Sequence, residues 1–128
     1  MTDKQVRQCF VRQSNFTELL DDLSPAQQAL CTALRQQVLA LPEPLSEVVW
    51  RAQKRVIYGV IREDAAVADN FVCISIDHAV RLGFFYAGAL DDPEGLLNGD
   101  GAVAVSAGTR PDALGDLLMA ALLQRKSG

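Results

Sequence analysis

The chain has 128 residues, a formal net charge of −4 and a sequence pI near 4.8. This length predicts a single domain that can bury a core without a metal or disulfide to hold it together. The acidic balance disfavours non-specific binding to nucleic acid, which needs clustered Lys and Arg to neutralise phosphates. We therefore expect no nucleic-acid partner.

Three cysteines, Cys9, Cys31 and Cys73, are an odd number and form no CxxC pair. This usage is typical of reduced thiols in a cytosolic protein. Residues 1–16 lack the apolar stretch of a secretory signal, and no apolar run approaches the roughly 18 residues of a membrane span. We expect a cytoplasmic protein without a membrane partner.

Residues 1–14 are mixed polar and are predicted to be a poorly ordered extension, with the domain covering 15–126. A helix is expected in 15–23. Ser24-Pro25 predicts the start of a second helix, because serine caps free amides and proline at the first position loses no hydrogen bond. That helix should run to about Ala40, since Pro42 and Pro44 cannot continue it.

The following segments change to the period of strands. A short strand or turn is expected near 47–51, a strand at 55–61, and a hairpin of 70–76 and 79–86. Residues 87–101 are irregular, 102–107 form a last short strand, and Arg110-Pro111 opens a final helix to about 123. The predicted fold is α+β: a mostly antiparallel sheet packed with N-terminal and C-terminal helices.

The central strands are apolar on both faces. Val56, Tyr58 and Val60 alternate with Ile57 and Ile61, which are equally apolar. A sheet with one wet face should instead alternate apolar with polar residues. We expect both faces to be covered, by helices on either side or by a second subunit. The second face is predicted to carry Ile57, Ile61, Val72, Ile74, Ile76 and Phe85, which favours a homodimer.

Several catalytic chemistries are missing from the sequence. His78 is the single histidine, which excludes zinc sites that need two from one chain. There is no GxSxG elbow, phosphate-binding loop or GxGxxG. Although His78 could transfer protons beside Asp77 and Arg81, a polar residue at a hairpin tip is the favoured interpretation.

Five residues could line a pocket for a small ligand: Trp50, Tyr58, His78, Phe84 and Tyr86. Aromatic residues of this kind are more often simply part of a core. Leu82 and Phe84 are predicted to be buried, and Arg81 is not, because side chains alternate along a strand.

Two groups of acids could hold a metal. Glu18, Asp21 and Asp22 have helical spacing and could bind a hard cation or iron, whereas the plainer interpretation is a solvated helix face. The second group is explained without a ligand by a proline turn. Its members are Asp91, Asp92 and Glu94.

One long motif resembles a known family. "EVVW", Tyr58-Gly59 and "NFVCISIDHAVRLGFFYAGALDDPEGLLNGDG" are similar to the YdhG-like family, one of the domains of unknown function. The resemblance covers about residues 17–123. Its pattern is matched by Leu82-Gly83-Phe84-Phe85, Gly88, Leu90, Asp92-Pro93, Leu96-Leu97, Gly99 and Gly101, with His78 one residue out of place. Relatives usually carry Lys after the last glycine, where this chain has Ala102.

The resemblance implies an α+β sandwich similar in outline to frataxin, and some members are described as frataxin-like iron chaperones. The leading hypothesis is a non-enzymatic protein that binds a ligand or metal, with iron as a possible cargo and no required cofactor. One alternative is a small-molecule-binding or enzymatic domain with a pocket near Trp50, His78 and Phe84. Another is a homodimeric interaction module.

Overall fold

The computed structural model describes residues 15–61, 69–90, 92 and 95–127, so the predicted extension at 1–14 lies outside the described residues. Two helices come first: α1 (Phe16–Leu20) and α2 (Pro25–Leu39). Each begins with a capping box, in which the Asn15 or Ser24 side chain accepts from the backbone three residues on. The start of α2 at Pro25 confirms the prediction from Ser24-Pro25.

Five antiparallel strands form one sheet in chain order, as a meander. They are β1 (Leu45–Trp50), β2 (Arg55–Val60), β3 (Asp69–Ile76), β4 (Val80–Phe84) and β5 (Ala102–Val105). β3 is the central strand. β4 ends two residues before the predicted boundary, which leaves Phe85 and Tyr86 outside the strand and exposed.

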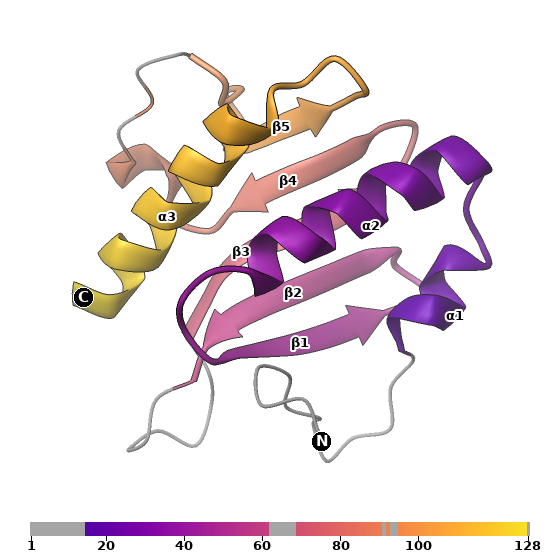
Figure 1. Cartoon of the computed structure of the whole chain (residues 1–128), viewed down its shortest axis with the longest axis horizontal. Coiled ribbons are helices and arrows are strands. Elements are labelled where there is room, and N and C mark those ends of the chain that lie inside the picture. Colours follow the sequence, from indigo (N-terminus) through magenta and orange to yellow (C-terminus); the bar gives the residue numbers. More distant parts are fainter. Residues whose placement is uncertain (1–14, 62–68, 91, 93–94, 128) are drawn as a thin grey trace.

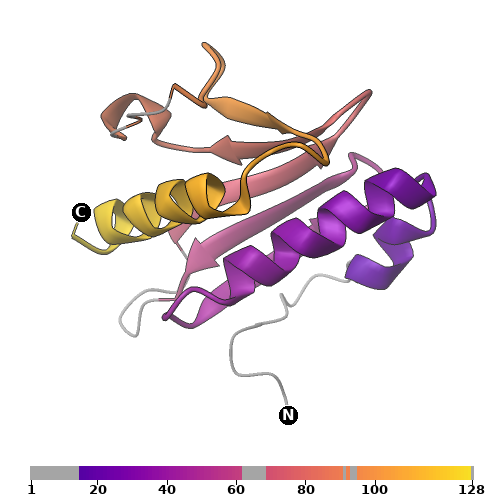
Figure 2. The ribbon, with the colours of Figure 1, turned by 45° about the horizontal axis from the view of Figure 1, so that its top comes forward.

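A short 3-10 helix, η1 (Ala87–Ala89), follows β4, and α3 (Pro111–Ser127) closes the described chain. Figures 1 and 2 show α2 and α3 side by side across the same face of the sheet. The α+β class is as expected from the sequence. Coverage by helices on either side is wrong for the described elements, because the two long helices share one face. Coverage of the other face by a second subunit stays a prediction.

The core lies between this face and the helices. From the sheet it receives Val56, Tyr58, Val72, Ile74 and Leu82, none of which has exposed surface. From α3 it receives Leu114, Leu117, Leu118, Ala121 and Leu122. The assignment of Val72, Ile74 and Ile76 to a second apolar face is therefore wrong. The strand register places these three residues beside buried core residues under the helices: Tyr58, Phe84, Val56, Leu82 and Val80.

The motif after β4 has a structural explanation. Both carboxylate oxygens of Asp92 accept backbone hydrogen bonds, from the amides of Leu96 (2.9 Å) and Leu97 (2.8 Å). Gly101 has φ +80°, and a Cβ there would come within 3.0 Å of the Ala87 side chain. Residues other than glycine rarely adopt that φ. Asp92 and Gly101 thus shape the return of the chain from β4 to β5.

None of the described helices is long and apolar enough to cross a membrane.

Candidate functional site

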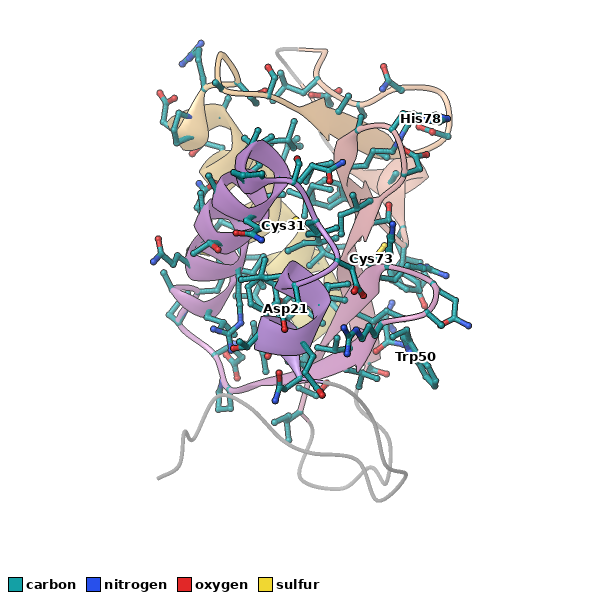
Figure 3. All side chains as sticks on the ribbon, turned by 90° about the vertical axis from the view of Figure 1, so that its right-hand side faces the viewer. Asp21, Cys31, Trp50, Cys73 and His78 are labelled. Carbon is teal, nitrogen blue, oxygen red and sulfur yellow. The ribbon has the colours of Figure 1, made fainter. Side chains whose placement is uncertain are left out.

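The face of the sheet opposite α2 and α3 carries no described helix, and we call it the open face. Its side chains alternate with the buried core residues along the central strands β2, β3 and β4. Figure 3 shows Trp50 and Cys73 on the side of the sheet away from α2, whereas Cys31 lies on the helix side. The open face is formed by Val48, Trp50, Arg55, Ile57, Cys73, Ser75, Arg81, Gly83 and Ala104.

The register arranges these side chains in two rows across the strands. One row runs from Val48 through Ile57, Cys73 and Gly83 to the buried Ala102 on β5, and the next runs from Trp50 through Arg55, Ser75 and Arg81 to Ala104 on β5. The β1–β2 half of these rows is therefore bulky, whereas the β4–β5 half carries, apart from Arg81, only glycine and alanine. Trp50 keeps 45% of its surface exposed, although the indole is the largest apolar side chain in the protein.

The small size of Gly83 matters to its cross-strand neighbour. A Cβ at this position would come within 3.2 Å of the Cys73 sulfur. Such a contact would force the sulfur to move by a few tenths of an ångström. Because Gly83 has no side chain, the centre of the open face does not protrude, and the half-buried Cys73 side chain lies there.

The charges of the open face differ between its two halves. On β2, the Arg55 guanidinium is exposed and approaches the Cys73 sulfur at 3.9 Å. On β4, the Arg81 guanidinium lies 3.6 Å from the Asp77 carboxylate and 3.5 Å from that of Asp100. One half therefore presents a cation and the other a cluster of one cation with two carboxylates.

The Asp77 carboxylate is held in place at the β3–β4 turn. A hydrogen bond from the Ala79 amide (2.9 Å), together with the charge of Arg81, lowers the pKa of Asp77. Asp77 therefore keeps its negative charge across the neutral range. Its own neighbour His78 is exposed at the tip of this turn, as the sequence predicted.

A second polar group lies on the helix side of the sheet, under α2. Glu47 on β1 is 6% exposed and receives two hydrogen bonds from Arg35 of α2, at 2.7 and 3.0 Å. The Tyr58 hydroxyl of β2 donates to the same carboxylate at 2.7 Å. Arg35 also lies over the Phe16 ring, 4.9 Å from its centre. Glu47 is thereby satisfied on both oxygens, as a buried carboxylate must be.

Burial and the Glu47 charge control ionisation in this group. Desolvation first, and the nearby Glu47 carboxylate second, raise the pKa of Tyr58 well above its ordinary value. Burial also raises the pKa of the Cys31 thiol to about 11. A thiol kept protonated is a poor nucleophile and metal ligand. This group therefore holds α2 against the sheet and has no free reactive atom.

The five predicted ligand residues do not lie together. Tyr58 and Phe84 are buried in the core on the helix side, whereas Trp50 is exposed on the open face. His78 is at a turn, and Tyr86 follows β4 with its ring 4.3 Å from the Arg125 guanidinium carbon. Burial of Leu82 and Phe84 confirms the predicted phase of β4, and Arg81 is half-buried.

Two of the three predicted metal-binding carboxylates have other partners. Glu18 accepts the Asn15 amide at 2.9 Å in the capping box of α1. Asp22 forms a two-pronged ion pair with Arg51, at 2.8 and 3.0 Å, which lowers the pKa of Asp22. Asp21 ends α1 and is exposed. Across the part of the chain that the structure describes, no three His, Cys, Asp or Glu side chains are grouped to hold a metal ion.

Comparisons with models of known protein families, with curated proteins and with solved structures find no match for this chain.

The sequence analysis missed two polar features of the strands: the buried Glu47 and the arginines of the open face. Glu47 interrupts the apolar pattern of Leu45 and Val49 at the phase of the core, which is a readable sign of a buried partner. Arg55 and Arg81 occupy the phase of Ile57 and Cys73. Their presence there was a sign that this face is not a second core.

Proposed function

We propose that this domain is a non-enzymatic interaction module that binds a partner through the open face of its sheet. One observation carries the proposal: both long helices lie on the other face, while Trp50 and Arg55 remain exposed on this one. Exposed tryptophan beside arginine is typical of the centres of protein interfaces, where these residues contribute most binding energy.

The composition of the open face supports a protein partner over a small ligand. Small ligands bind in concave pockets that bury most of their surface. The open face is instead a broad surface in which Val48, Ile57 and Cys73 form an apolar strip flanked by Trp50 and Arg55. An apolar strip with charged residues beside it fits the usual anatomy of protein–protein interfaces.

The enzymatic alternative has less support from the geometry. The two groups with strongly raised pKa values are both buried, Cys31 on α2 and Tyr58 beneath it, where the Tyr58 hydroxyl is bonded to Glu47. A catalytic acid or base must instead reach a substrate proton within hydrogen-bond distance. The iron role that the YdhG-like resemblance implies would need carboxylates that are not already engaged, and Glu18 and Asp22 both are.

The proposal is tested by the reactivity of Cys73 in the full chain. Replacing Cys9 by Ser leaves Cys73 and the fully buried Cys31 as the two thiols. At nanomolar protein concentration, a maleimide dye should label one thiol of the native protein, and Cys73→Ser should abolish the labelling. If Cys73 reacts no faster than Cys31, the chain itself covers this face and the proposal is wrong.

A further inference from the structure

The open face is complementary to itself under one particular two-fold rotation. Building on the proposed function, we propose that its partner is a second copy of this chain, related by a two-fold axis that lies in the interface close to the direction of β3. Most homo-oligomers are two-fold dimers, in which the same surface patch contacts itself. The shape of the open face favours this axis, and its charges are compatible with it.

The shape argument follows from the strand order. An axis along the central strand places β1 over the partner's β5 and β2 over the partner's β4. At the level of the second row, Trp50 then faces Ala104, and at the first row Ile57 faces Gly83. Apart from the Arg55 and Arg81 positions, the bulky side chains of each copy meet the small ones of the other. An axis perpendicular to the strands would place Trp50 against the partner's β1, bulky against bulky.

The charges of the open face are compatible with the same axis. At the second row, Arg55 on β2 would lie over the partner's Arg81, whose guanidinium lies between the Asp77 and Asp100 carboxylates. That cluster has a net charge of −1, from two carboxylates and one guanidinium. The exposed Arg55 of each copy would therefore approach a net negative group on the other, and no described carboxylate pairs with Arg55 within its own chain.

The size of the face sets the expected affinity. Five strands about 4.8 Å apart, with about five residues each at 3.4 Å, give a footprint of roughly 400 Å². A standard stable interface buries about 800 Å² of accessible surface on each partner. The dimer should therefore be weak and concentration-dependent, and aligned sheets of this kind cross at about 30°.

Sedimentation equilibrium of the full chain tests the dimer directly. Between about 1 and 200 µM, the average mass should rise from 13.9 kDa toward twice that value. Trp50→Ser and Ala104→Arg should each weaken association at least tenfold, because they alter facing halves of the same contact. Both positions are exposed, so neither variant should lose its fold. Met119→Ser, an exposed apolar residue of α3, is the matched control and should leave association unchanged.

Thiol chemistry distinguishes this inference from the proposed function. In the Cys9→Ser chain, two copies of Cys73 lie near the axis, within reach of a bis-maleimide that spans about 10 Å, the usual spacing of packed sheets. Cross-linked dimer should form at 100 µM and disappear with Ala104→Arg, and dye labelling of Cys73 should slow as concentration rises.

A monomeric mass at 200 µM, or a dimer that Trp50→Ser and Ala104→Arg leave unchanged, would overturn the inference. Cys73 labelling that is fast at every concentration would overturn it too, while leaving the open face available to a different protein. Protection of Cys73 at nanomolar concentration would instead overturn the proposed function.

Discussion

On the helix-covered face of the sheet, Val56, Ile74 and Leu82 have no exposed surface, whereas one residue away along the same strands Ile57, Cys73 and Arg81 are only half-buried. The two faces also treat charge differently. Under α2, Glu47 is enclosed and bonded by Arg35 and Tyr58. On the open face, Arg55 and Asp77 remain accessible to water. The packed core that stabilises the fold thus lies on one face of the sheet.

The largest expected difference between the faces is the effect of a truncated apolar residue. Phe84→Ala should lower the free energy of unfolding by about 3–5 kcal/mol, because it opens a cavity in a packed core. Trp50→Ala removes a larger side chain from the open face and should cost less than about 1 kcal/mol. Urea denaturation of both variants measures the contrast. Equal losses would mean that the open face is a second core.

Two of the described ion pairs, Arg35–Glu47 and Arg51–Asp22, should differ in the same way. Glu47→Ala leaves the Tyr58 hydroxyl and one side of Arg35 without their acceptor, and should cost on the order of 3 kcal/mol. Asp22→Ala breaks an equally short pair with Arg51 at the surface. That loss should be much smaller, because water screens a pair at the surface. A Glu47→Ala loss no greater than that of Asp22→Ala would show that water already reaches Glu47.

High pH should lower the free energy of unfolding through two groups on the helix side of the sheet. Tyr58 and Cys31 have raised pKa values in the folded protein, so the unfolded chain loses these protons at lower pH. The contribution of these two groups to the free energy of unfolding is complete below their ordinary pKa values. It is lost as pH rises, from about pH 9 for Cys31 and about pH 10 for Tyr58.

Tyr58→Phe should cost about 1 kcal/mol at pH 7 through its lost hydrogen bond, and should flatten the fall in stability above pH 10. Cys31→Ala should flatten the fall between pH 9 and 11 in the same way. Unfolding free energies of the three proteins across this range measure both slopes. A wild-type curve that stays flat to pH 11 would contradict the raised pKa values.

The smallest expected effect concerns iron. Ferrous titration at micromolar concentration should show no stoichiometric binding, because Glu18 and Asp22 are already bonded to Asn15 and Arg51. Any weak binding should fall when Glu18, Asp21 and Asp22 are replaced by Gln or Asn. Tight binding that survives this triple substitution would require a different site and would revive the role implied by the YdhG-like resemblance.

Local sequence determined the parts of the fold that depend on neighbours in the chain. Ser24-Pro25 set the start of α2 because capping and proline geometry act within one turn. The alternation of Val56, Tyr58 and Val60 was correct along β2 because side chains alternate on any strand. The turn residues around Asp92 and Gly101 also shape the chain as their types suggested.

Only the tertiary structure decided which side chains of neighbouring strands lie on the same face of the sheet. It also decided which face the helices cover. Alternation gives a period but not the register between strands, so Ile74 was wrongly placed beside Ile57 although pairing puts it beside Val56 and Leu82. An apolar helix stripe likewise does not say which side of a sheet it will reach. The side was set by the connections that bring α2 and α3 to one face, and that choice left Trp50 and Arg55 on the other.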